Sequence, residues 1–287
     1  MTTISFEVFP PRSVGASFDL WQTAQDLAPL DPDFYSVTCG AGSGRATHEL
    51  TRDAAKALAS RFSVDVMAHL TMVGQSRAEM LAAAEALRSA GVRDILALRG
   101  DATPGEPWAA HPGGFANTVE MVGALADTGA FRIRVAAYPE THPDSADTAQ
   151  NIAWLKAKLD AGAEAAITQF FFDVDDFLRF RDACAAAGIT APLIPGLMPI
   201  TDWDRASRFA RRVGARVPDR LAQAFATAAR DNRTRLLALA EGTEMAETLI
   251  REGAEHLHFY TLNQPDLTRD ICTALGLRGE AQLRDVA

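Results

Sequence analysis

The chain has 287 residues, of which 48% are hydrophobic and 23% are charged, and its net charge is −9 with a pI near 5.2. This length and composition suit one ordinary soluble globular domain. The acidic balance argues against a nucleic-acid partner, because contact with a phosphate backbone needs clustered Lys and Arg. No apolar stretch reaches the ~20 residues that cross a bilayer, so we expect no membrane association.

The cysteines and the first residues of the chain indicate the cellular compartment in which we expect the protein. Cys39, Cys184 and Cys272 are far apart and lack metal-ligand spacing, which favours a reducing environment and no metal site. The first residues lack the basic and apolar regions of a signal peptide, so we expect a cytoplasmic protein. Cys39 follows the second predicted strand and could lie near a site, but packing is its expected role.

Eight short apolar runs predict strands, and helical patterns fill the gaps between them. The runs cover residues 4–8, 34–38, 64–72, 95–98, 133–138, 165–172, 193–198 and 256–262. The helical patterns cover about 18–28, 47–62, 76–90, 117–128, 145–161, 174–187, 203–213 and 267–275. Ser76 and Glu79 have the spacing of a capping box at the start of the third helix. Continuous apolar runs are typical of parallel strands that are covered on both faces.

Repeated strand–helix units predict either a closed barrel or an open doubly wound sheet. The glycine cluster at 40–44 lacks the spacing of a dinucleotide fingerprint, which favours the barrel. We therefore predict an α/β fold, a single (β/α)₈ TIM barrel over residues 1–287. Residues 216–230 and 231–253 both look helical, so an extra helix is expected before strand eight.

A barrel would gather the polar residues at the strand ends around one mouth. These residues are Glu7, Thr38, His69, Arg99, Asp101, Tyr138, Gln169 and Asn263. Glu7 lies between apolar residues, so it is either a structural carboxylate, neutralised by an Arg or pointing outward, or a general acid whose pKa burial raises. His69 is either a satisfied core histidine or a ligand.

Three other segments are candidates for contact with a flat ligand. Gly100 between Arg99 and Asp101 would let the backbone approach a flat ligand, but the segment could be an ordinary loop with an ion pair. Two alanines before Tyr138 leave room for a planar group. Gln169 could belong to a core strand, yet an interior amide needs a partner and suits a pterin-like ring that displays donors and acceptors.

Eight motifs, in order over nearly the whole chain, resemble the methylenetetrahydrofolate reductases, in the short bacterial form without a regulatory domain. Each motif is weak alone, but the ordered set is specific. The motifs are Ser5-Phe-Glu-Val-Phe-Pro-Pro-Arg12, Ser36-Val-Thr-Cys-Gly40, Ala68-His-Leu-Thr71, Leu98-Arg-Gly-Asp101, Ala137-Tyr-Pro-Glu-Thr-His142, Ala166-Ile-Thr-Gln-Phe-Phe-Phe-Asp173, Ile194-Pro-Gly196 and His258-Phe-Tyr-Thr-Leu-Asn263.

The resemblance implies an FAD-containing barrel that reduces 5,10-methylenetetrahydrofolate to 5-methyltetrahydrofolate with NADH or NADPH. Glu7 then matches the acid that protonates folate, and Asp101 matches the carboxylate near the flavin. Gln169 and Phe209 match substrate contacts. One flavin face that serves both substrates in turn implies ping-pong kinetics. The residues at FAD-contact positions are Thr38, His69, Arg99, Gly100, Asp101, Tyr138, His142 and Lys158.

The chain departs from the family pattern on the helix after strand five and at two predicted substrate positions. Asn151, Trp154 and Ala157 stand where the family usually has Asp, Asn and Arg toward FAD. We still expect Asn151 and Trp154 to contact the cofactor, although Trp154 either stacks on adenine or covers a hydrophobic helix face. Gln264 replaces a substrate-contacting Arg, and Arg205 occupies a polar folate position; both are predicted substrate contacts.

Two other functions remain as alternatives. The altered FAD helix suggests direct hydride transfer from NAD(P)H to folate without flavin. A non-catalytic binding paralogue is the third hypothesis, against which the intact set of Glu7, Asp101 and Gln169 argues. A homo-oligomer is expected.

Overall fold

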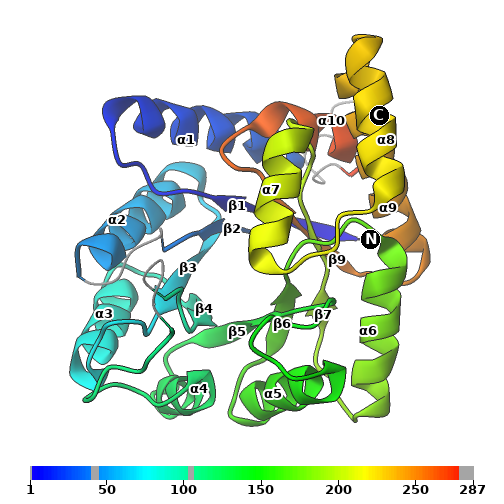
Figure 1. The fold of residues 1–287 in the computed structure, drawn as a ribbon. Coiled ribbons are helices and arrows are strands. Elements are labelled where there is room, and N and C mark those ends of the chain that lie inside the picture. The colour runs from blue at the N-terminus through cyan, green and yellow to red at the C-terminus, as the bar shows by residue number, and fades with distance from the viewer. Residues whose placement is uncertain (1, 40–44, 103–106, 278–287) are drawn as a thin grey trace.

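The structure, a computed structural model, describes residues 2–39, 45–102 and 107–277. The glycine cluster at 40–44 therefore lies outside the described residues. Parallel strands form one sheet at the centre, and helices surround it (Figure 1). The strands are β1 (Thr3–Val8), β2 (Phe34–Val37), β3 (Asp65–Thr71), β4 (Asp94–Leu98), β5 (Arg132–Ala137), β6 (Ala165–Thr168), β7 (Leu193–Ile194), β8 (Gly196–Leu197) and β9 (His256–Tyr260).

The sheet closes through β7 and β8, which are two halves of the seventh predicted strand. β7 pairs with β6, and β8 pairs with β9, which in turn pairs with β1. Pro195 separates the halves because it has no N–H to donate to the ladder, although its carbonyl oxygen accepts from His258 N at 3.0 Å. Eight strand positions thus form the predicted (β/α)₈ barrel, with one position split at a proline.

The predicted helices are present with small shifts at their ends. They are α1 (Val14–Leu27), α2 (Arg45–Phe62), α3 (Arg77–Ser89), α4 (Thr118–Ala126), α5 (Thr148–Asp160), α6 (Val174–Ala186), α7 (Trp203–Val213), α8 (Asp219–Arg230), α9 (Thr234–Arg251) and α10 (Pro265–Ala274), with a short 3₁₀ turn at Ala28–Leu30. The capping box of Ser76 and Glu79 is confirmed. Both segments of the long link before β9 are helical, as α8 and α9.

Alternation along each strand divides the core into two layers. Ile4, Phe6 and Val8 of β1 pack outward against the helices, whereas Ser5 and Glu7 face the barrel interior. The interior is filled by a second apolar cluster, so the barrel is not a pore. This inner cluster consists of Phe34, Met67, Leu96, Ala165, Ile167 and Ile194.

The amino-terminal ends of the strands are held by buried charges. Asp94, whose side chain is 3% exposed, pairs with both Arg132 and Arg134, and Arg132 also reaches Asp65 at 2.7 Å. A buried carboxylate is tolerated when it is paired in this way. This network closes the end of the barrel opposite to the predicted mouth.

The carboxyl ends of the strands are partly covered by α7, which lies in front of the strands in Figure 1. β6 ends at Thr168, earlier than predicted, because Gln169 N makes the last bond to β5, at Ala137 O. Phe170, Phe171 and Phe172 follow and are all buried; the rings of Phe171 and Phe172 pack against α6 and α7, whereas Phe170 lies at the mouth of the barrel. The apolar run was therefore longer than the strand it predicted.

Candidate active site

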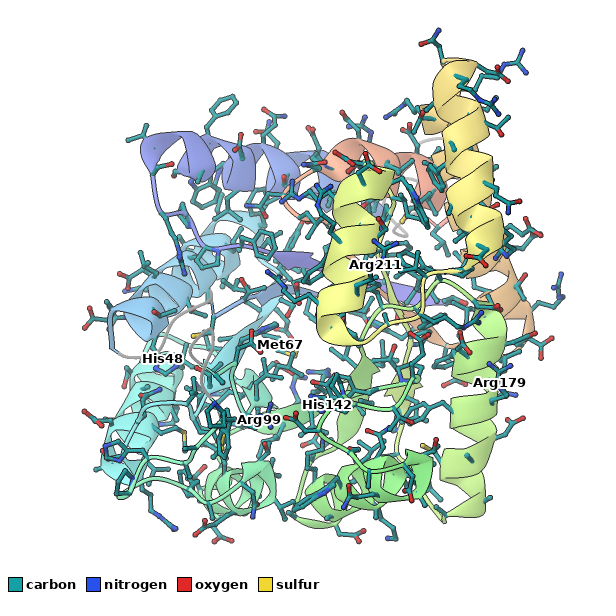
Figure 2. The ribbon with its side chains drawn as sticks, in the orientation of Figure 1. His48, Met67, Arg99, His142, Arg179 and Arg211 are labelled. Atoms are coloured by element: carbon teal, nitrogen blue, oxygen red, sulfur yellow. The ribbon has the colours of Figure 1, made fainter. Side chains whose placement is uncertain are left out.

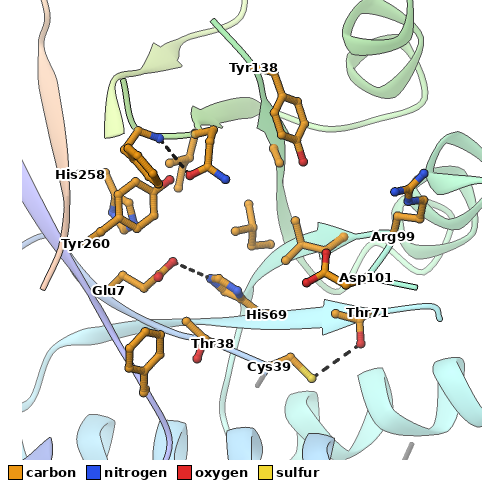
Figure 3. Close-up of a pocket in the computed structure, with 18 of the residues that line it drawn as sticks. Glu7, Thr38, Cys39, His69, Thr71, Arg99, Asp101, Tyr138, His258 and Tyr260 are labelled. Atoms are coloured by element: carbon orange, nitrogen blue, oxygen red, sulfur yellow. Dashed lines mark hydrogen bonds and ion pairs between the residues drawn. The ribbon is translucent and has the colours of Figure 1, made fainter. Parts of the chain in front are cut away.

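A cavity of about 320 Å³ opens at the carboxyl ends of the strands. We call it the central cavity (Figure 3). It brings together predicted site residues from six strand ends and from α7. Those that line it are Glu7, Thr38, His69, Arg99, Gly100, Asp101, Tyr138, His142, Gln169 and Phe209.

Glu7 projects from β1 into the central cavity, between Ser36 of β2 and Tyr260 of β9 in the ladder. Its side chain is 12% exposed, and burial raises its pKa to about 8. None of the described Lys or Arg side chains lies within ion-pair distance of it. Neither form of the structural interpretation holds, because Glu7 is not neutralised by an Arg and does not point outward. Burial keeps the carboxyl group protonated at neutral pH.

His69 is the neighbour of Glu7 across the cavity floor, and Figure 3 draws the contact. Its Nε2 lies 3.5 Å from Oε2 of Glu7 and 2.9 Å from Oγ of Ser36. Burial lowers the pKa of His69 to about 3, so the imidazole is neutral. The pair is therefore a contact between two uncharged groups, not an ion pair, and Glu7 keeps its proton.

Two cavity residues on β9 were not singled out from the sequence. Tyr260 donates its hydroxyl to Thr168 O at 2.6 Å, and burial raises its pKa. His258 Nδ1 lies 2.7 Å from Ser5 Oγ. The alternation of polar residues at 256, 258 and 260 was the available signal, since alternate strand residues share a face.

The loop after β4 has a backbone that requires glycine. Gly100 has φ +84, and a Cβ there would lie 2.4 Å from Cγ1 of Val73. Arg99 does form a loop ion pair, but with Asp144 at 2.7 Å, and its guanidinium lies over the ring of Trp108. Asp101 is exposed at the rim and has no ion pair within the described part of the chain.

A second cavity of about 300 Å³, the side cavity, adjoins the central cavity and shares Arg99, Tyr138 and His142 with it. Figure 2 shows Arg99 and His142 near the strand ends. α5 contributes the predicted residues Asn151, Trp154 and Lys158 to the lining.

The polar groups of α5 in the side cavity already have partners. Asn151 Nδ2 donates to Tyr138 O at 2.9 Å, and Lys158 Nζ donates to Ala136 O at 2.6 Å. Burial lowers the pKa of Lys158 to about 8, so an anion bound beside it would restore its full charge. Trp154 is 48% exposed.

The predicted substrate-binding residues do not all line the same cavity. Gln169 accepts from Phe170 N through Oε1 at 3.0 Å, which leaves Nε2 for a ligand. Phe209 of α7 stacks on Phe170 with ring centroids 5.3 Å apart. Arg205 lines a third cavity of about 460 Å³ beside α7, which we call the α7 cavity.

Gln264 does not lie at the central cavity, contrary to the expectation. It precedes Pro265 at the start of α10 and lines a different cavity, beside α1. Leu262 and Asn263 both have φ +53, and this left-handed turn carries the chain away from the mouth. Asn263 instead pairs its amide with the backbone of Phe9.

Cys39 also differs from the expectation of plain packing. It lines the central cavity, half-buried, with Sγ 3.7 Å from Thr71 Oγ1. Burial raises the pKa of its thiol, which therefore stays protonated at neutral pH.

The donors around both cavities fit a long ligand with a flat polar head. Three buried polar atoms at the linings have no partner: Oγ1 of Thr38, Nε2 of His258 and Nε1 of Trp108. Buried polar atoms of this kind call for a ligand or water. In the described residues, no three His, Cys, Asp or Glu side chains are grouped to hold a metal ion.

The fold and the site define a (β/α)₈-barrel enzyme with its active site at the carboxyl ends of the strands. The family model of methylenetetrahydrofolate reductase matches residues 1–276. The chain belongs to this family of oxidoreductases, which reduce methylenetetrahydrofolate in one-carbon metabolism. None of the helices in the described part of the chain has the length and hydropathy of a membrane span.

The relatives cover nearly the whole chain. The 5,10-methylenetetrahydrofolate reductases of Salmonella typhimurium and Escherichia coli are each 40% identical over 276 residues, 96% of this chain and 91% of theirs. Methylenetetrahydrofolate reductase (NADH) 1 of Arabidopsis thaliana is 33% identical over 98% of this chain and 50% of its own length.

A solved structure shares the fold. It is a Clostridium thermocellum protein described as binding two copies of 5-methyl-5,6,7,8-tetrahydrofolic acid. It has a TM-score of 0.60 and 13% identity, and the match covers 95% of this chain and 94% of that one.

The raised pKa of Glu7 predicts a loss of stability with rising pH. Between the unfolded pKa of about 4.5 and the folded pKa of about 8, the folded chain keeps a proton that the unfolded chain releases. The contribution of Glu7 to the free energy of unfolding is full below the unfolded pKa. It falls by ~1.4 kcal/mol per pH unit between the unfolded and the folded pKa. Urea unfolding of Glu7→Gln should therefore show a gain over wild type that grows by a few kcal/mol from pH 5 to 8.

The exposed carboxylate of Glu255 supplies the matched control. Glu255→Gln should follow the wild-type pH profile. A constant difference between Glu7→Gln and wild type at all pH values would show that Glu7 is ionised in the folded protein.

Proposed function

We propose that this protein is a flavin-dependent reductase that converts 5,10-methylenetetrahydrofolate to 5-methyltetrahydrofolate with NADH or NADPH. The observation that carries the proposal is the burial of Glu7, which raises its pKa to about 8, in a cavity that Gln169 and Phe209 also line. Reduction of this substrate needs a proton on the nitrogen that leaves as the five-membered ring opens, and a protonated acid within the cavity supplies it.

The residues of the two joined cavities fit FAD. The flavin, when bound, supplies a hydride carrier between the nicotinamide and the folate. The central cavity would hold the flat ring system, and the side cavity would hold the adenosine diphosphate half. The residues that would hold the group are Thr38, His69, Arg99, Gly100, Asp101, Tyr138 and His142 in the central cavity, and Asn151, Trp154 and Lys158 in the side cavity.

The other side chains of the central cavity have separate parts in this proposal. Gln169 Nε2 would donate to an acceptor on the folate ring, and Phe209 would stack on the substrate. Asp101, without an ion pair to the described residues, would stabilise the positive charge that develops on the folate. One cavity that serves two substrates in turn leads to ping-pong kinetics. The printed name of the Arabidopsis relative supports NADH as the donor.

Direct hydride transfer without flavin is the second candidate. It is favoured by α5, where Trp154 and Ala157 stand at polar positions of the family and Lys158 donates to a backbone carbonyl. The two joined cavities favour the flavin, because Arg99 lines both of them and its guanidinium can donate to one ligand that occupies both.

The first test is the absorption spectrum of the freshly purified protein. We expect a yellow protein that carries stoichiometric FAD, released on denaturation and bleached by NADH or NADPH. This expectation rests on the two joined cavities, whose lining residues include buried polar atoms without a partner. A colourless protein that binds no added FAD, yet reduces methylenetetrahydrofolate with NAD(P)H, would establish direct transfer instead.

The second test separates the two half-reactions of Glu7→Gln by stopped flow. Flavin reduction by NAD(P)H should be within about threefold of wild type, whereas folate reduction should fall by at least ~100-fold, the usual contribution of a general acid. Wild-type folate reduction should decline as pH rises above about 8, where Glu7 loses its proton.

Glu7→Asp is the control, since it keeps a carboxylic acid and should retain more folate reduction than the amide does. Equal losses in both half-reactions of Glu7→Gln would show that Glu7 is structural rather than catalytic.

A further inference from the structure

Tyr260 lies directly beside Glu7 in the barrel, because the two residues are partners in the ladder between β1 and β9. Both side chains line the central cavity, and Figure 3 draws the Tyr260 ring next to the Glu7 carboxyl group. The ladder partner of Glu7 on its other side is Ser36 of β2, a small residue. The tyrosine ring is therefore the larger of the two side chains that the neighbouring strands place beside Glu7.

Three contacts hold the Tyr260 ring in place. Its hydroxyl donates to Thr168 O at 2.6 Å, and its ring makes edge contacts with Phe170 and His258, with centroids 6.4 and 5.2 Å apart. A buried tyrosine usually has a partner for its hydroxyl, and here that partner is the backbone of β6. The one polar atom of the side chain is thus committed, and the rest of the side chain is apolar.

The split seventh strand provides the space for this ring. Gly196 opens β8, and a Cβ there would lie 2.6 Å from Cε2 of Tyr260 and 2.3 Å from Thr168 O. Any side chain at residue 196 would therefore displace the tyrosine ring or the β6 backbone that anchors it. Gly196 N also donates to Thr168 Oγ1 at 2.9 Å. The glycine that follows Pro195 is thus required for the packing of Tyr260.

Neighbouring charges do not account for the proton on Glu7. Among the described residues of the central cavity, Arg99 and Asp101 carry charge near neutral pH, and Arg99 is paired with Asp144. The other titratable groups of its lining are uncharged there, because burial lowers the pKa of each histidine and raises the pKa of each tyrosine and of the thiol. These groups are Cys39, His69, Tyr138, His142, His258 and Tyr260. Exclusion of water is therefore the reason that Glu7 keeps its proton.

We propose that Tyr260 is a positioning residue that keeps water away from Glu7 and so preserves its carboxyl group as an acid. This inference rests on the proposed function, in which Glu7 gives a proton to the leaving nitrogen of the folate. Tyr260 itself transfers no proton, because its hydroxyl is committed to Thr168 O and burial raises its pKa. Without the ring beside it, Glu7 would be hydrated and would ionise at neutral pH, as an exposed glutamate does.

The test follows the titration of Glu7 in the Tyr260→Phe, Tyr260→Leu and Tyr260→Ala holoenzymes. The infrared C=O band of Glu7 is isolated in each by subtracting the spectrum of the same variant that also carries Glu7→Gln. Phenylalanine keeps the ring, so the band should still disappear near pH 8. Leucine and alanine cover progressively less of Glu7, so the midpoint should fall to ~7 and ~6, toward the value of an exposed glutamate.

Folate reduction should change in the same order. A midpoint of ~6 leaves roughly a tenth of Glu7 protonated at pH 7, so Tyr260→Ala should lose about tenfold in the folate half-reaction at that pH. The loss should largely disappear at pH ~5, where Glu7 regains its proton. A tyrosine with a merely structural part would instead slow the half-reaction equally at both pH values.

Leu257→Ala is the matched control, because it removes a large buried side chain from the same strand on the face toward the helices. It should keep the midpoint of the Glu7 band near pH 8. Tyr260→Leu, the milder change, decides the case if Tyr260→Ala does not fold.

Two results would overturn the proposal. One is an unchanged midpoint in Tyr260→Leu and Tyr260→Ala, and the other is a fall in Tyr260→Phe as large as the fall in Tyr260→Ala. Failure of the proposed function is distinguishable, since the wild type would then reduce no methylenetetrahydrofolate. The Glu7 band and its dependence on Tyr260 would still be measurable, because the infrared titration needs no turnover.

Discussion

The active site depends on the burial of one carboxyl group without a cation beside it. Glu7 is held by β1 at the floor of the central cavity, and its nearest ionisable neighbour, His69, is itself uncharged. Burial without a cation destabilises an ordinary structural carboxylate, but in the proposed reaction it keeps a proton available at neutral pH. The stability that such a site costs is offset by the two apolar layers of the barrel.

The barrel places this acid where a ligand can reach it. The inner apolar cluster and the Asp94 network fill the opposite end, so the cavity opens at the carboxyl ends of the strands alone within the described barrel. α7 lies over that opening and supplies Phe209 to the lining of the central cavity.

The fold and most of the cavity lining were predictable from the sequence, since strand and helix periods are local properties. Ending each strand at its polar residue was enough to bring Glu7, His69 and Gln169 together. The prediction for Gln264 failed because the direction of the chain there depends on the backbone angles of two residues. The left-handed turn at Leu262 and Asn263 moves Gln264 away, and no apolar pattern encodes it. The split of the seventh strand was missed for another reason, because Pro195 has no N–H for the ladder and the apolar run continues through it.

The most direct measurement of the central claim is the protonation state of Glu7 itself. Infrared difference spectra of wild type minus Glu7→Gln isolate the C=O stretch of this one carboxylic acid. The band should be present at pH 7 and disappear on titration near pH 8, the raised pKa that burial gives. A band that is lost near pH ~4.5, as for an ordinary glutamate, would contradict the account.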